Sequence, residues 1–206
     1  MAPKFIRSFF LVSIVLSLLS ALVPSGSVYA MAAEANVPSL PSLETFAELV
    51  KSGQAGELRG IYIHDVLAAP IVRQPKGLEE FVSPWHNIVT QFGLASNYGS
   101  IGLLAHNYLA GEQFALLEPG QEIHLIYGDG QIYSFTVSEV LHYQALDPAS
   151  TSSSFVNLDN QESLTYSDLF TKIYNRPGQV IFQTCISAGE DFAWGRLFVI
   201  AEPSSW

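Results

Sequence analysis

Short apolar segments in which alternate side chains are hydrophobic dominate the chain downstream of residue 58. A period of two is typical of strands that bury one face, and turn residues bound each segment. Gly128-Asp129-Gly130 separates two of the segments and predicts a hairpin. The pattern predicts seven strands: residues 59–64, 68–72, 101–106, 122–127, 131–143, 180–184 and 197–201.

Helical spacing of apolar residues is confined to short stretches. Residues 42–52 predict a helix that Ser42 caps and that ends at Gly53. Residues 83–93 predict a second helix, because Ser-Pro opens the segment and Trp85, Ile88, Val89 and Phe92 recur on one face. Leu164 to Ile173 predicts a helical or irregular segment that ends at Pro177-Gly178. Many strands with little helix predict an all-β barrel or sandwich with short peripheral helices.

The beginning of the chain has the order of a secretory signal peptide. Lys4 and Arg7 precede an apolar run, residues 9–23, and Val28-Tyr29-Ala30 offers small residues for cleavage. The run is shorter than the roughly 20 residues that a membrane span needs, so cleavage after Ala30 is expected, with an uncleaved anchor as the alternative. We therefore predict an exported protein: signal segment 1–30, linker and short helix 31–57, and one folded domain, 58–206.

Composition narrows the function classes. The 206 residues include 9 Lys and Arg against 19 Asp and Glu, a net charge of −10, with 49% hydrophobic and 14% charged residues. So apolar a chain is not disordered, and its shortage of basic residues argues against nucleic acid as a partner. A single cysteine rules out an intrachain disulfide. An unpaired thiol in an exported protein indicates intermolecular pairing or a reactive site.

Cys185 is the candidate nucleophile. The sequence has no phosphate-binding loop, HExxH, CxxC or GxSxG motif, so the common nucleotide, zinc and serine sites have no local support. Ile181, Gln183 and Cys185 share one face of the predicted strand 180–184, and Arg196 precedes the next strand. If the two strands pair antiparallel, the Arg196 cation lies within reach of Cys185, where it favours the thiolate and stabilises an oxyanion.

His106 is the preferred acid or base. All five histidines precede Cys185 in the chain, which argues against a papain-like peptidase, in which the histidine follows the cysteine. His106 follows an apolar strand and enters a loop, whereas His124 and His142 lie within strand patterns, where a structural or surface role is expected. A lone cysteine is ordinarily an inert small hydrophobe; its conjunction with His106, Thr184 and Arg196 favours a reactive one.

Three segments together resemble the sortases, cysteine transpeptidases of the bacterial cell surface. They are Leu104-Ala105-His106-Asn107, Ile181-Phe182-Gln183-Thr184-Cys185 and Trp194-Gly195-Arg196 before an apolar strand. The middle segment resembles the TLxTC motif, with Ile-Phe where the family has Thr-Leu, which leaves the subclass open. The resemblance covers residues 58–203 and keeps the family order of His, Cys and Arg.

The resemblance implies an eight-stranded β-barrel and a transpeptidase that cleaves an LPxTG-like sorting signal. It implies that Cys185 attacks the Thr-Gly carbonyl, that His106 protonates the leaving amine and deprotonates the incoming one, and that Arg196 stabilises the oxyanion or holds substrate, with Thr184 assigned to substrate binding. The implied partners are sorting-signal peptides and an amine acceptor such as a peptidoglycan stem peptide or a pilin lysine. The polar region 145–178 is expected to line the substrate groove.

Two other functions stay open on the same fold. One is a non-catalytic module that binds a surface peptide or wall component, and the other is a hydrolytic cysteine peptidase. No cofactor is expected: some sortases bind calcium, but the acidic residues here are spread along the chain without EF-hand spacing. Wall anchoring and pilus assembly are not distinguished.

Overall fold

The computed structural model describes residues 39–204, so the signal segment predicted at 1–30 lies outside the described residues. Within the described range no helix has the length and apolar character needed to cross a bilayer. The helices are α1 (Leu43–Val50), α2 (Gly111–Phe114) and α3 (Tyr166–Tyr174), with a 3-10 turn η1 (Leu94–Tyr98). The strands are β1 (Leu58–Ile63), β2 (Leu67–Arg73), β3 (Val89–Phe92), β4 (Ile101–Leu104), β5 (Glu122–Tyr127), β6 (Ile132–Ala145), β7 (Phe155–Asn157), β8 (Ser163–Leu164), β9 (Val180–Ala188) and β10 (Asp191–Pro203).

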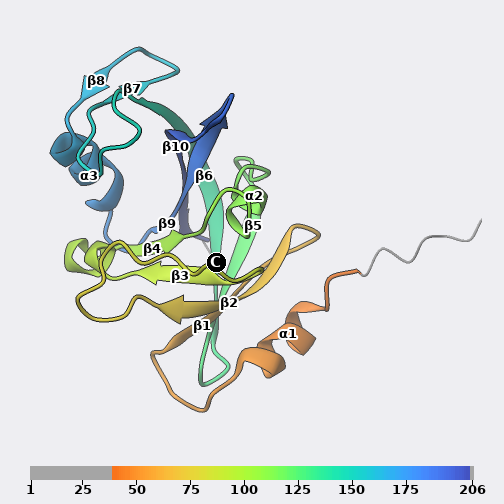
Figure 1. The fold of residues 1–206 in the computed structure, drawn as a ribbon. Coiled ribbons are helices and arrows are strands. Elements are labelled where there is room, and N and C mark those ends of the chain that lie inside the picture. The colour runs from red at the N-terminus through yellow and green to blue at the C-terminus, as the bar shows by residue number, and fades with distance from the viewer. Residues whose placement is uncertain (1–38, 205–206) are drawn as a thin grey trace, which may run out of the picture. The chain divides into compact units, whose positions relative to one another are not determined.

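Eight of these strands close into a barrel, shown in Figure 1. The order around the ring is β10-β9-β4-β3-β2-β1-β5-β6, and pairing of β10 with β6 closes it. The pairs β2–β3 and β4–β9 are parallel and the other pairs in the ring are antiparallel. β7 and β8 extend the sheet beyond β6 and lie with α3 on one side of the barrel (Figure 1). The prediction of an all-β barrel with short peripheral helices is confirmed.

The barrel wall formed by β4, β9 and β10 separates two apolar cores. Along β9, Val180 and Phe182 face the barrel interior, while Ile181 faces a second core outside it. β10 alternates in the same way, with Leu197 and Val199 inside and Phe198 and Ile200 outside. Leu169, Ile173 and Tyr174 of α3 cover the outer core. The outer face of this wall is therefore buried where α3 packs on it. A site can form at the end of the face that α3 leaves uncovered.

Helix α1 packs on another part of the barrel. Ser42 caps it by accepting a hydrogen bond from the backbone N–H of Thr45, as its sequence predicts. Phe46 and Val50 pack with Tyr62, Ala68 and Ile126 of the outer barrel surface. A Cβ on Gly60 would lie 3.0 Å from atoms of both Phe46 and Val50, so the glycine in β1 permits this close approach.

The second predicted helix, residues 83–93, was wrong. Residues 81–88 lie outside any helix or strand, with a turn at 86–87, and Val89–Phe92 is the strand β3. The Ser83 backbone N–H donates to the Thr90 hydroxyl at 2.9 Å, and Asn87 has a left-handed φ of 54° while its side chain donates to the Ala68 carbonyl. These bonds hold the segment in a turn, and pairing with β2 and β4 then favours the strand over helical spacing.

The strands that carry Cys185 and Arg196 are longer than predicted. β9 continues past Cys185 to Ala188, and β10 begins at Asp191, so neither residue lies at a strand end. A register shift between Asp191 and Gly195 marks a bulge in this hairpin. The irregular stretch interrupts the alternation of apolar and polar residues, so the sequence did not predict the first part of β10 as a strand.

The first part of the polar region, residues 145–162, contains short strands. It contains β7, which pairs with β6, and ends beside β8, which pairs with β7. The buried Ser153 hydroxyl accepts a hydrogen bond from the Asp147 backbone N–H at 2.9 Å. Such hydrogen bonds between a serine side chain and nearby backbone stabilise the conformation of this segment. The helix α3 follows, capped by Thr165, where a helical or irregular segment was predicted.

Candidate active site

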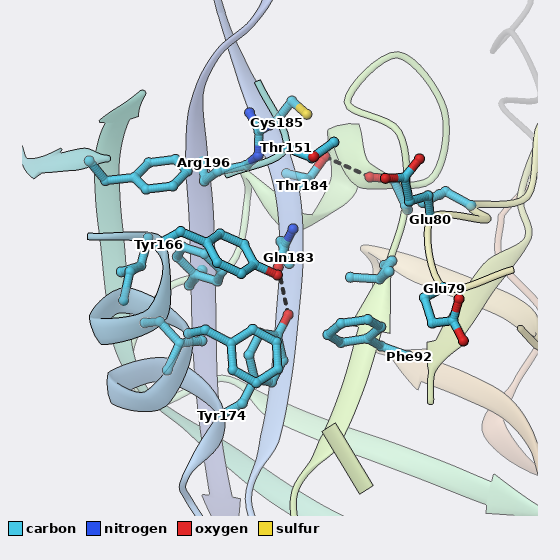
Figure 2. A pocket seen from close by; sticks show the side chains of 18 of the residues that line it. Glu79, Glu80, Phe92, Thr151, Tyr166, Tyr174, Gln183, Thr184, Cys185 and Arg196 are labelled. Carbon is cyan, nitrogen blue, oxygen red and sulfur yellow. Dashed lines mark hydrogen bonds between the residues drawn. The ribbon is translucent and has the colours of Figure 1, made fainter. Parts of the chain in front are cut away.

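A cavity of about 410 Å³ lies on the outer face of the barrel wall, between that wall and α3. Its volume suits a short peptide segment or a small ligand. His106, Thr184, Cys185 and Arg196, the residues singled out by the sequence, all line it. Of the five histidines, all within the described residues, only His106 does so. Figure 2 shows Cys185 and Arg196 at one end of the cavity and Tyr174 and Phe92 at the other.

Cys185 and Arg196 are direct partners in the antiparallel register of β9 and β10. Opposed residues in such a pair project from the same face, with Cβ atoms about 5 Å apart. Cys185 is a half-buried free thiol. The antiparallel pairing on which the sequence argument depended is therefore observed, and it places a permanent cation beside the sulfur.

The bulge in β10 orients the Arg196 guanidinium. Its Nη1 donates to the carbonyl oxygens of Ala193 at 2.9 Å and Gly195 at 2.8 Å. Ala193 lies in the stretch between Asp191 and Gly195 that has no register partner on β9, and Gly195 is where regular pairing resumes. An arginine carries five N–H donors, so the donors on Nη2 and Nε remain for a ligand.

The loop that carries His106 is attached to the hairpin that carries Cys185. The Asn107 side-chain nitrogen donates to the Ser187 hydroxyl at 2.7 Å and to the Phe192 carbonyl at 3.1 Å. The ring of Tyr108 stacks on the His106 imidazole with centroids 5.2 Å apart and planes inclined by 16°. The histidine is thus held by the two residues that follow it. Asn107, called the Asn107 clamp below, ties the loop to the hairpin, and Tyr108 stacks on the imidazole.

Thr184 lies on the opposite face of β9 from its neighbour Cys185. It is 3% exposed, and its hydroxyl donates to the Ala105 carbonyl at 2.9 Å. An added Cβ on Gly111, at the start of α2, would collide with the Thr184 hydroxyl and with the carbonyl of His106. The hydroxyl that the sequence assigned to substrate therefore already has a backbone acceptor, and it ties the Cys185 strand to the His106 loop.

Sequence reasoning missed the far end of the cavity. Tyr174 is 2% exposed, and its hydroxyl donates to the Gln183 side-chain oxygen at 2.6 Å. Burial raises the pKa of Tyr174 well above its usual range, so the phenol stays protonated. The signal for Gln183 was present, because it shares the face of Cys185; its partner on α3 had no signal. Other lining residues from this side are Phe155, Tyr166, Leu169, Phe170 and Ile173.

Two carboxylates lie on the remaining side of the cavity. Glu79 and Glu80, in the loop between β2 and β3, face the α3 side across the opening in Figure 2. Both are exposed to solvent. In residues 39–204, no three His, Cys, Asp or Glu side chains gather in a way that could hold a metal ion.

Comparison with known proteins identifies structures of similar fold. No family model matches the sequence, and no curated protein matches it. The similar solved structures include sortase C-1 from Actinomyces oris, with a TM-score of 0.49 and 13% identity over 82% of this chain and 83% of that one. Sortase A from Corynebacterium diphtheriae has a TM-score of 0.48 and 13% identity over 74% and 63% of the two chains.

A third similar structure is sortase E1 from Streptomyces coelicolor with a tripeptide in the active site. Its TM-score is 0.44 and its identity 18%, over 75% of this chain and 91% of that one. Together with a sortase D5 from Clostridium perfringens, the similar structures span four sortase classes.

Proposed function

We propose that this protein is a sortase-like cysteine transpeptidase that cleaves a sorting-type peptide and transfers the acyl part to an amine. The observation that carries the proposal is the shared cavity: the only thiol in the chain, a paired arginine and a single histidine line one opening. Nucleophile, oxyanion donor and proton carrier are the three roles that acyl transfer requires. The exported location predicted from the sequence agrees with such a role and is part of the proposal.

The chemistry follows from the three side chains. The Cys185 thiolate attacks the scissile carbonyl carbon, and His106 gives a proton to the leaving amine as the C–N bond breaks, which leaves a thioester on Cys185. An incoming amine attacks the thioester, His106 takes its proton, and the C–S bond breaks to restore the thiolate. Arg196 donates its remaining N–H groups to the carbonyl oxygen, where negative charge develops in both steps.

The partners of this reaction would be sorting-signal peptides of the LPxTG type and an amine acceptor such as a peptidoglycan stem peptide or a pilin lysine. One similar structure, sortase C of Clostridium perfringens, holds a C-terminal cell wall sorting motif. We extend that kind of substrate to this chain as a proposal, supported by a cavity that is long enough to have one reactive end and one apolar end.

The test is intact-mass analysis of the protein incubated with a mixed library of LPxTG-like peptides, with and without an amine acceptor. We expect an acyl adduct on the wild-type protein that disappears when the amine is added, with a new peptide-amine product. Cys185→Ala should give no adduct. Arg196→Lys keeps the charge but not the forked donors, and we expect it to form adduct more slowly.

Other outcomes separate the alternatives. An adduct that water resolves as fast as the amine would make the protein a hydrolytic peptidase. No adduct, with a thiol that reacts with a small electrophile, would reject these peptides as substrates. No adduct together with an inert thiol would favour the non-catalytic binding module and overturn the proposal.

A further inference from the structure

Away from Cys185, the side of the cavity that the barrel wall and α3 form is mainly apolar, and the exposed Glu79 and Glu80 lie on the opposite side. The walls of the apolar side come from four elements, β3, β4, β10 and α3, and consist mainly of aliphatic and aromatic side chains: Phe92, Leu104, Leu169, Phe170, Ile173 and Phe198. Among them lie the Gln183 amide from β9 and the Tyr174 hydroxyl from α3, joined by a hydrogen bond of 2.6 Å (Figure 2). A polar pair in such surroundings orients whatever binds there.

Packing fixes Tyr174. Its ring contacts Phe92 and Phe170 with centroid distances of 5.2 Å and 4.9 Å, and the residue is 2% exposed. Because burial keeps the phenol neutral, the hydroxyl remains a donor throughout the physiological pH range. This donor holds the Gln183 oxygen, and Figure 2 shows the amide nitrogen directed toward the Cys185 end of the cavity.

The Gln183 nitrogen lacks an acceptor among the described residues. Its two neighbours across the sheet are Phe198 on β10 and Leu104 on β4, neither of which has a polar side chain. Gln183 is half-buried and lines the cavity, so in the free protein water meets its N–H groups. A ligand that displaces this water without offering an acceptor leaves the donors unpaired, which weakens binding by roughly five- to a hundredfold.

We propose that Gln183 is a specificity-determining residue whose side-chain nitrogen donates a hydrogen bond to an oxygen of the bound peptide, with Tyr174 orienting the amide. The inference rests on the proposed function for the kind of ligand. It makes the preferred peptide one that carries a neutral oxygen acceptor along the apolar end of the cavity. A peptide that presents only an aliphatic or a cationic group to the amide is disfavoured. The oxygen comes from a peptide carbonyl or from an amide or hydroxyl side chain.

Binding is measured on the Cys185→Ala background, so that turnover does not intervene. Fluorescence anisotropy with labelled LPxTG-like peptides gives Kd for this protein and for versions that also carry Gln183→Met or Tyr174→Phe. Gln183→Met keeps length and volume and removes the donor, and we expect it to raise Kd by about five- to a hundredfold. Tyr174→Phe frees the amide to rotate, and we expect a smaller rise. Gln131→Met, the same change at an exposed position outside the cavity, should leave Kd unchanged.

Modified peptides identify the source of the oxygen. Each residue is replaced in turn by a near-isostere without side-chain oxygen, such as Asn by Leu or Thr by Val, and each backbone carbonyl by a thioamide. The modification that removes the acceptor should weaken binding to the Cys185→Ala protein and have no further effect once Gln183→Met is present. Side-chain replacement and thioamide replacement thus report the two sources separately.

The inference is overturned if Gln183→Met binds every peptide within twofold of its parent, or if no peptide in the library binds. Thermal unfolding of each variant shows that the comparison is between folded proteins, and Tyr174→Phe provides a second route should Gln183→Met unfold. Acylation of wild-type Cys185 is scored separately. An adduct without an effect of Gln183→Met on binding rejects this inference and keeps the transpeptidase. Gln183-dependent binding without any adduct keeps this inference and rejects the transpeptidase.

Discussion

At the scale of single residues, Thr184 organises the site without facing the sulfur. Its hydroxyl reaches the Ala105 carbonyl, one residue before His106, across two strands that are 79 positions apart in the sequence. The strand alternation allowed the sequence to place Cys185 and Gln183 on one face. It could not show that the Thr184 hydroxyl donates to the Ala105 carbonyl, because a sequence pattern does not reveal which carbonyl lies opposite.

Replacing Thr184 by Val should destabilise the fold. The shape is nearly preserved, but the buried Ala105 carbonyl loses its donor, which costs about 1–3 kcal/mol in free energy of unfolding. Urea denaturation measures the change. Thr184→Ser keeps the hydroxyl and should recover most of the loss; a Val variant as stable as the wild type beside a destabilised Ser variant would show that the methyl group and not the hydrogen bond matters.

Gly111→Ala should impair acylation of Cys185. The new Cβ would lie 2.6 Å from the His106 carbonyl and 2.8 Å from the Ala105 carbonyl, so the backbone of the histidine loop has to move. We expect at least a tenfold lower acylation rate, since misplacement of a catalytic group by about 1 Å can cost 10²-fold. Gly93→Ala is the matched control, because its nearest neighbour would be a Gln74 side-chain atom at 3.7 Å. Equal rates for both variants would contradict this account of the loop.

At the scale of elements, sequence periodicity identified seven strands, among them the four-residue β4, and missed three short ones. All seven predicted strands are present, whereas β7 and β8 have three and two residues, too few to show a period. β3 was assigned to a helix because Val89 and Phe92 are also three apart. Their strand conformation comes from partners on β2 and β4, which local spacing does not reveal.

The Asn107 clamp joins two elements, and its removal should slow the chemistry more than it destabilises the fold. Asn107→Ala removes both hydrogen bonds to the β9–β10 hairpin, and we expect the acylation rate to fall by roughly two- to tenfold, the equivalent of one hydrogen bond. Ser187→Ala removes only one partner and should cost less. Stopped-flow acylation beside thermal unfolding separates the two effects; a large drop in melting temperature with an unchanged rate would assign Asn107 to stability alone.

At the scale of the whole molecule, the resemblance anticipated the closed barrel better than local patterns did. Alternation alone was equally consistent with a barrel and a sandwich. Closure depends on β6 and β10, which are 14 and 13 residues long and pair along most of their length. Only residues 197–201 of β10 were predicted, because its first half contains the bulge, so the closing pair was not visible in the sequence.

Stability should fall at alkaline pH. Burial raises the pKa of Tyr174 and of Tyr127 above the ordinary value of 10.0, whereas unfolding returns both to it. Above pH 10 the folded state therefore binds more protons than the unfolded state, and the free energy of unfolding decreases as pH rises. Urea titrations from pH 8 to 11.5 should show this decline, and Tyr174→Phe should make it shallower. An identical slope in the variant would contradict the assignment to Tyr174.

Because the wall is buried on both faces, the direction in which Cys185 points depends on whether β9 changes in length by an odd or an even number of residues. Successive side chains from Val180 to Cys185 alternate between the barrel interior and its outer face. Inserting or deleting one residue upstream within the strand would therefore turn the thiol inward; an insertion would present Thr184 in its place, and a deletion Ile186. Changes of two residues preserve the outward thiol. Engineered or natural variants that keep a reactive cysteine on this framework should therefore differ in that stretch by even numbers, which turns residue counting into a screen for function.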